Sequence, residues 1–295
     1  WLSAMGTIMD ADDAYLGVNG HARFVSSAAG SGVAGVVVGD SDDDFIVVES
    51  VSFEVLGGGF ALRENDSVLI SSMDGFVNRA AHVDIVAMGN LANDAGTSIQ
   101  VSGNALFEGT VIELGDELDD NLQFGSTTIT AGSHVTLYQD SSIFFTGRSF
   151  VGGDLDAFAT GTIADSMTSR LNVVQHARFE GAAITIVDSE APAGPGEDGD
   201  IFRANTLQFY SEGNVAITED GDMVLDTENH ANVLRLETVD SMAADGSLSN
   251  LAGTVLDVVS NLFVKAVGNI TLGSDPGDTI RFDNLNFNSP GVVDI

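Results

Sequence analysis

The nine residues "LGVNGHARF" at Leu16–Phe24 return, loosely, three more times along the chain. The other copies are "IQVSGNALF" at Ile99–Phe107, "LNVVQHARF" at Leu171–Phe179 and the weaker "VLDVVSNLF" at Val255–Phe263. Their final Phe residues are 83, 72 and 84 positions apart. Self-similarity at such a step is the signature of a solenoid or an array of repeats. A chain of this kind usually works as a scaffold or a surface rather than around one unique pocket.

The blocks around each copy recur too. A lead-in precedes the first three copies: "GTIMDADDAY" from Gly6, "GNLANDAGTS" from Gly89 and "GTIADSMTSR" from Gly161. After the first two copies, an apolar alternation ends at an acidic turn, in "VVVGDSDDD" (Val36–Asp44) and "VIELGDELDD" (Val111–Asp120). We therefore expect one continuous solenoid over residues 1–295, a section of a longer repeat protein, with approximate units 6–88, 89–160, 161–245 and 246–295.

The periodicity of the apolar residues is two, which marks β-strands. Examples are "FIVVESVSFEV" at Phe45–Val55, "LQFGSTTIT" at Leu122–Thr130 and "LRLETV" at Leu234–Val239. Gly, Asp, Asn and Ser interrupt the strands and signal turns. A short helix is expected only around Asp240–Asp245. The predicted fold class is all-β, a parallel β-helix of about four degenerate units of 72–84 residues.

Each of these units divides into three or four turns of roughly 20–25 residues, which suits a β-solenoid. A tandem array of β-sandwiches remains the alternative, because about seven strands fit in a unit of this length. The spacers between the units lack linker character, and the Trp and Tyr signatures of immunoglobulin-like sandwiches are not found.

The charge balance excludes several partners. The formal net charge is −34, from 44 acidic and 10 basic residues. Phosphate neutralisation needs Lys and Arg, so we expect no nucleic-acid binding and no adhesion to anionic membranes. The chain has no cysteine, which removes disulfides, thiol catalysis and cysteine-based zinc sites. No apolar run approaches the roughly 18 residues of a membrane span, so membrane insertion is not expected.

The combined pattern LxVxGxAxF…IxLGD…DxxxF…LxFxSxGxVxI covers essentially the whole chain. It resembles large bacterial extracellular β-helical repeat proteins, the filamentous-haemagglutinin-like and autotransporter-passenger-like surface proteins. The resemblance implies a right-handed parallel β-helix, export to the cell surface or the extracellular space, and a structural or adhesive role. It implies no catalytic residues.

The acidic turns are the candidate sites. Carboxylates one, two or four positions apart in a Gly-containing turn can converge on one hard cation, and Ca²⁺ takes six to eight oxygen ligands. The alternative is that Asp favours turns and keeps the molecule soluble. Neither an EF-hand nor the calcium β-roll repeat is present. If the turns bind Ca²⁺, we expect them to line up along one edge. The candidate metal ligands are Asp40, Asp42, Asp44, Asp116, Asp119, Asp120, Asp198, Asp200, Asp275 and Asp278.

The sequence predicts no enzyme. His21 and His176 share a repeat position that Asn104 fills in the second unit, and no nucleophile elbow or phosphate-binding loop is found. The predicted function is an extracellular structural repeat protein that self-associates into a filament or layer. An adhesin stalk that binds a glycan or another cell is the alternative, with a polysaccharide-degrading β-helix enzyme as the third reading.

Overall fold

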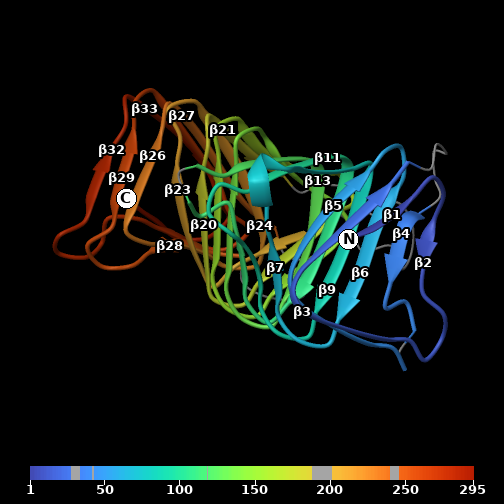
Figure 1. Ribbon diagram of the computed structural model, residues 1–295. Coiled ribbons are helices and arrows are strands. Elements are labelled where there is room, and N and C mark those ends of the chain that lie inside the picture. Colours follow the sequence, from blue (N-terminus) through green and yellow to red (C-terminus); the bar gives the residue numbers. More distant parts are fainter. Residues whose placement is uncertain (28–33, 42, 118, 188–200, 240–245) are drawn as a thin grey trace. The chain divides into compact units, whose positions relative to one another are not determined.

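A computed structural model describes residues 1–27, 34–41, 43–117, 119–187, 201–239 and 246–295. The chain divides into two compact units, Trp1–Ser141 and Ser142–Ile295. Each unit is built from short β-strands that follow one another around successive turns (Figure 1). The predicted helix around Asp240–Asp245 lies outside the described residues. Within them, the one helix is a short 3₁₀ turn, η1, at Met73–Gly75.

The strands of the first unit are β1 (Leu2–Ala4), β2 (Ile8–Met9), β3 (Tyr15–Ser26), β4 (Ala34–Val38), β5 (Phe45–Val55), β6 (Gly59–Glu64), β7 (Val68–Ile70), β8 (Val77–Ala80), β9 (His82–Ala87), β10 (Leu91–Asn93), β11 (Ser98–Gly109), β12 (Ile112–Leu114), β13 (Asn121–Ala131) and β14 (Val135–Gln139).

The strands of the second unit are β15 (Ile143–Phe145), β16 (Arg148–Val151), β17 (Leu155–Ala159), β18 (Thr162–Asp165), β19 (Arg170–Val173), β20 (His176–Glu180), β21 (Ala183–Ile186), β22 (Ile201–Arg203), β23 (Thr206–Tyr210), β24 (Asn214–Asp220), β25 (Met223–Leu225), β26 (Glu228–Ala231), β27 (Val233–Val239), β28 (Leu248–Asn250), β29 (Val255–Val258), β30 (Asn261–Lys265), β31 (Ile270–Thr271), β32 (Thr279–Arg281), β33 (Asn284–Asn288) and β34 (Val293–Asp294).

Every strand pairs in parallel with the strand one turn away. In the first unit Ile99 of β11 lies opposite Leu122 of β13, 23 positions later. In the second unit Arg148 of β16 lies opposite Arg170 of β19, 22 positions later. These offsets confirm the predicted turn length and the parallel β-solenoid. They exclude the sandwich array, whose sheets are antiparallel.

The core is a column of inward-facing side chains inside each unit. Phe53 and Phe60 stack with their ring centroids 4.3 Å apart, and Phe24 packs against Phe60 at 5.9 Å. In the second unit Phe179 meets Phe202 edge to face at 5.6 Å. All of these rings are at most 2% exposed. Alternating strand residues therefore fill the interior, as the period of two predicts.

The Phe that ends each sequence copy is buried in three copies and exposed in the fourth. Phe24, Phe107 and Phe179 are at most 1% exposed, whereas Phe263 is 41% exposed and Leu262 is buried in its place. The fourth copy is thus aligned one residue off in the sequence, and a shift of one residue in a strand moves every side chain to the other face. Phe263 belongs to the outer surface, between Arg235 and Asn286 of the adjacent turns.

Candidate metal centre

The acidic turns are one local structure that appears three times in the described residues. Each turn follows a strand through a Gly with positive φ: Gly39 at 77°, Gly115 at 78° and Gly273 at 69°. Each ends, five residues later, at an Asp just before the next strand: Asp44, Asp120 and Asp278. We call this segment of the chain the clasp turn.

The final Asp ties the clasp turn to the preceding turn of the solenoid. Asp44 accepts hydrogen bonds from the backbone N–H of Ser41 (2.9 Å) and of Ala14, one turn back (2.7 Å). Asp120 accepts in the same way from Glu117 (3.2 Å) and Thr97 (2.8 Å). The two carboxylates are only 6% and 7% exposed. Their first role is therefore to satisfy buried backbone donors, which are costly to leave unpaired.

Asp278 accepts hydrogen bonds from the equivalent groups of the third clasp turn, but it is more exposed than Asp44 and Asp120. It accepts hydrogen bonds from Asp275 N (3.0 Å), Thr254 N (3.1 Å) and the Asn250 amide Nδ2 (2.9 Å). The bond from Asn250, helped by the backbone donors, lowers the pKa of Asp278. Hydrogen bonds to an ionised carboxylate favour the charged form, so this clasp turn keeps its charge.

A residue of the preceding turn completes each clasp, and here the three copies differ. In the second clasp Asn93 accepts from Gly115 N through Oδ1 (2.6 Å) and donates through Nδ2 to Asp120 (2.7 Å). Asn250 does the same with Gly273 N (2.8 Å) and Asp278. One amide side chain thus bridges the glycine and the carboxylate.

In the first clasp turn the bridging residue is Asp10, an acid. Its Oδ2 accepts from Gly39 N at 2.8 Å, as the amide oxygen of Asn does elsewhere. Its Oδ1 is buried and has no hydrogen-bond partner in the described part of the chain. In the other two clasp turns an amide N–H donor occupies the position of this second carboxylate oxygen. The carboxylates of Asp10 and Asp44 therefore face each other with no hydrogen-bond donor between them.

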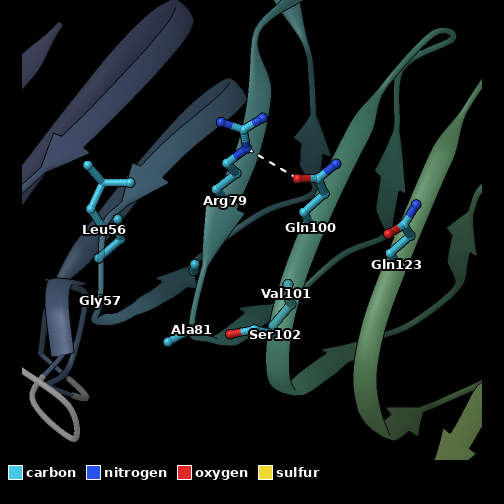
Figure 2. A pocket seen from close by; sticks show the side chains of 10 residues that line it. Leu56, Gly57, Arg79, Ala81, Gln100, Val101, Ser102 and Gln123 are labelled. Atoms are coloured by element: carbon cyan, nitrogen blue, oxygen red, sulfur yellow. Dashed lines mark hydrogen bonds between the residues drawn. The ribbon is translucent and has the colours of Figure 1, made fainter.

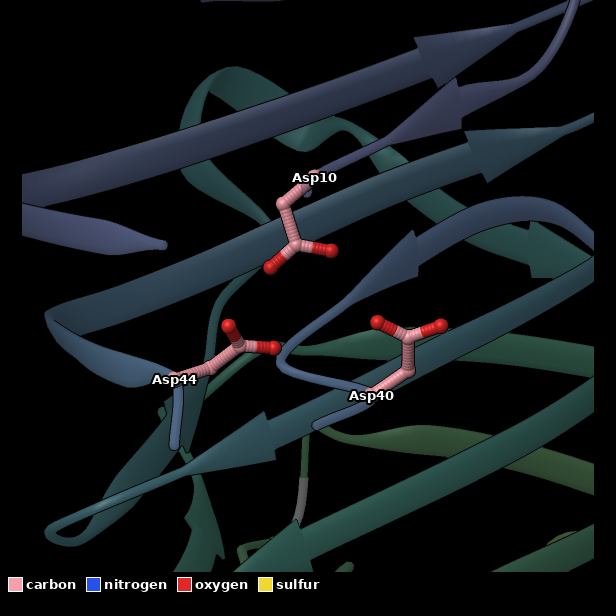
Figure 3. A group of neighbouring side chains, drawn as sticks. All are labelled: Asp10, Asp40 and Asp44. Atoms are coloured by element: carbon pink, nitrogen blue, oxygen red, sulfur yellow. The ribbon is translucent and has the colours of Figure 1, made fainter. Parts of the chain in front are cut away.

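Asp40 joins this pair. One carboxylate oxygen from each of Asp10, Asp40 and Asp44 lies within 4.8 Å of the others. Figure 3 shows the three side chains pointing toward one another, Asp10 from the end of β2 and the other two from the turn between β4 and β5. Three converging carboxylates offer the hard oxygen ligands that Ca²⁺ prefers, and a bound cation would remove the repulsion between Asp10 and Asp44.

The structure brings together only part of the predicted ligand set. Asp40 and Asp44 meet, and the sequence analysis missed Asp10, their third partner. The available signal was the fifth residue of the lead-in blocks, which alternates between Asp and Asn: Asp10, Asn93 and Asp165. Asp116, Asp119 and Asp275 are exposed, and Asp120 and Asp278 face an amide; Asp42, Asp198 and Asp200 lie outside the described residues.

The expectation that the acidic turns form one edge is wrong for the first unit. Asp120 lies directly before the first half of β13. This half pairs with β11, β11 pairs with β8, and β8 pairs with Glu54 in the second half of β5. Asp44, in contrast, lies directly before the first half of β5. The two clasps therefore lie at different corners of the solenoid, because the 76 positions between Asp44 and Asp120 are not a whole number of turns of 22 or 23 residues.

Two buried glutamates stand outside the clasp turns. Glu64 and Glu219 are 0% and 2% exposed, and each accepts a backbone N–H of the preceding turn through Oε1, from Val48 (2.9 Å) and Ala204 (3.0 Å). Gln139 makes the equivalent bond to Phe124 N (2.9 Å). The other oxygen of both glutamates is buried and has no partner among the described residues.

Burial is the main cause of the pKa shifts of these glutamates. It raises the pKa of Glu64 to about 7 and that of Glu219 to about 8, where Asp222 and Asp220 add repulsion. Both carboxyls are therefore protonated at mildly acidic pH.

Two grooves on the outer surface are lined by described residues. The first, of about 450 Å³, lies over β8, β11 and β13. Figure 2 shows Arg79, Gln100 and Gln123 in a row across it, with Arg79 Nε donating to Gln100 Oε1 at 3.2 Å. The second, of about 430 Å³, lies over β24, β27, β30 and β33 of the second unit and contains Arg235, Phe263 and Lys265.

Comparisons with models of protein families, with curated proteins and with solved structures gave no match. The described residues contain no helix that is long and apolar enough to cross a membrane.

Proposed function

We propose that this chain is an extracellular structural repeat protein in which Ca²⁺ holds the first clasp turn together. The observation that carries the cation is the partnerless Oδ1 of Asp10, which stands where two other clasps place an amide donor. A Ca²⁺ ion at this place would be coordinated by carboxylate oxygens of Asp10, Asp40 and Asp44. Water or carbonyl oxygens would complete its coordination shell. Calcium sites of extracellular modules typically have Kd values of about 0.1–1 mM, a range that fits the proposed location.

The structural role is supported by the way the chain uses its polar residues. In the clasp turns the carboxylates and amides bind backbone groups of the neighbouring turn, so they serve the fold. The proposal assigns no catalytic role to them. A β-solenoid also presents unpaired strand edges at its last turns, and such edges can add a further chain. We propose that self-association into a filament or layer uses these edges, with bound Ca²⁺ offsetting part of the repulsion within a chain of net charge −34.

Electron microscopy of the purified protein tests this function. We expect filaments or sheets in calcium that separate into single particles after chelation, and we expect the Asp10→Asn variant to assemble in both conditions, since its amide replaces the ion. Single particles in both conditions for the wild-type protein would contradict the structural assembly.

A second candidate function, adhesion to a glycan, is favoured by one observation. The second groove combines an exposed aromatic ring with two of the ten basic residues of the chain. Grooves that pair an apolar surface with a few well-placed polar groups are typical ligand sites.

A further inference from the structure

The second groove has a floor that belongs to a continuous sheet. β27 pairs with β24 on one side and β30 on the other, and β30 pairs with β33. β24, β27 and β30 are paired on both sides, so a peptide cannot add between them as an extra strand, whereas β33 pairs with β30 alone among the described strands. A ligand that lies across the groove is therefore recognised by the outward side chains, which repeat about 4.8 Å apart from turn to turn.

The outward side chains form two adjacent rows. In the first row Arg235, Phe263 and Asn286 lie opposite one another on successive turns. In the second row Glu237, Lys265 and Asn288 do so. The aromatic ring of Phe263 is therefore flanked by a guanidinium on one side and by amide groups on the other.

The charges of these rows leave the groove positive. Arg235 Nη2 donates to Glu237 Oε2 at 2.9 Å, and Lys265 Nζ pairs with the other oxygen of the same carboxylate. Burial alone would raise the pKa of Glu237, but the hydrogen bonds from Lys265 and Arg235 outweigh it and lower the pKa. Two cations thus share one ionised carboxylate, and the cluster carries one net positive charge.

The cations remain accessible. The Arg235 side chain is 64% exposed and that of Lys265 is 44% exposed, whereas that of Glu237 is 6% exposed. The buried acid holds the two cationic side chains in place, and both side chains remain substantially exposed. A guanidinium held in this way is suited to a carboxylate, which it can bind through two parallel N–H bonds.

We propose that this groove binds an acidic saccharide, a chain of sugar rings that carries carboxylates. Phe263 offers its exposed face to the apolar side of one ring, Arg235 and Lys265 take a carboxylate, and Asn286 and Asn288 bind hydroxyl groups. The proposal names the ligand class for the second candidate function above. Densely charged polyanions such as nucleic acids are disfavoured by the acidic remainder of the chain.

Isothermal titration of the full chain with hexagalacturonate, in a chelator, tests the proposal. The chelator removes any calcium bridge through Asp10, so failure here is distinct from failure of the calcium-dependent assembly, which microscopy scores separately. We expect saturable binding that weakens about tenfold in Arg235→Gln and in Phe263→Ala, a change well within the energy of one lost contact. Arg79→Gln in the first groove is the matched control and should change the affinity less than about twofold.

Two further probes identify what is recognised. The methyl-esterified hexagalacturonate keeps the rings and loses the charge, and we expect it to bind at least about tenfold more weakly because the charged hydrogen bonds are gone. Hexaglutamate carries carboxylates without sugar rings and should also bind more weakly. No binding of hexagalacturonate to the folded chain, equal binding of hexaglutamate, or loss of binding in Arg79→Gln but not in Arg235→Gln would each overturn the proposal.

Discussion

Replacing Glu219 by Gln should make the second unit less sensitive to alkaline pH. In the unfolded chain the carboxyl titrates near its usual pKa of 4.5, and in the folded protein burial raises this pKa to about 8. Between these values the folded state binds a proton that the unfolded state lacks, so stability falls as pH rises. Below both values, and above both, the slope from this group vanishes.

The expected loss is large. One pKa unit corresponds to about 1.4 kcal/mol, so between about pH 5 and about pH 7.5 the wild-type protein should lose roughly 3 kcal/mol through Glu219. The amide side chain of the Glu219→Gln variant would keep the bond from Ala204 N to Oε1 and cannot ionise. The variant should therefore match the wild type near pH 5 and exceed it by several degrees in thermal midpoint near pH 7.5.

Differential scanning calorimetry across this pH range measures the effect, and hydrogen exchange of the Ala204 amide reports it locally. Gln139→Glu is the matched reverse variant, because Gln139 makes the equivalent bond with an amide and should acquire a pH slope once it is an acid. Glu64→Gln should remove a similar slope over a narrower pH range and so a smaller total loss, since the pKa of Glu64 is raised only to about 7. A wild-type midpoint that stays flat from about pH 5 to about pH 8, or a Glu219→Gln variant that keeps the wild-type slope, would refute the reasoning.

Two pairs of substitutions test the packing. Phe107→Ala should cost about 3–5 kcal/mol, whereas Phe263→Ala should cost less than about 1 kcal/mol, because the first ring is buried and the second is 41% exposed; similar thermal midpoints for the two variants would show that the fourth copy is wrongly placed. Gly115→Ala should lower the thermal midpoint more than Gly96→Ala: both glycines have positive φ, but an added Cβ would lie 2.4 Å from the Tyr138 carbonyl oxygen at Gly115 and meets no atom at Gly96. Equal losses would mean that backbone strain alone, without the steric contact, sets the cost.

The fold class was predictable because it depends on local patterns. The alternation in Phe45–Val55 and the Gly and Asp residues between strands specify short strands and tight turns, and the repetition favours a solenoid. The register was less predictable. Phe263 matched Phe107 in the alignment but lies on the opposite face, since one residue of slip inverts a strand and the sequence pattern of the fourth copy is weak.

The candidate site was predictable only in part. The turn that contains Asp40 and Asp44 is recognisable by its acids, but its chemistry depends on the residue that the solenoid stacks against it. Asp10 and Asn93 occupy the same place in their lead-in blocks and differ in one atom, an oxygen for an amide nitrogen. Only the pairing of β2 with β4 and of β10 with β12 shows that this atom faces a buried carboxylate.

The most direct test of the calcium clasp is the thermal midpoint of metal-free protein, measured with and without added Ca²⁺ in the wild type, Asp10→Asn and Asn93→Asp. A ligand that binds only the folded state adds about 2.7 kcal/mol at a concentration of about one hundred times its Kd. We expect that Ca²⁺ raises the wild-type midpoint, that Asp10→Asn is more stable than the wild type without metal and does not respond to it, and that Asn93→Asp gains a second response. An Asp10→Asn variant that responds to Ca²⁺ as the wild type does would contradict the calcium clasp.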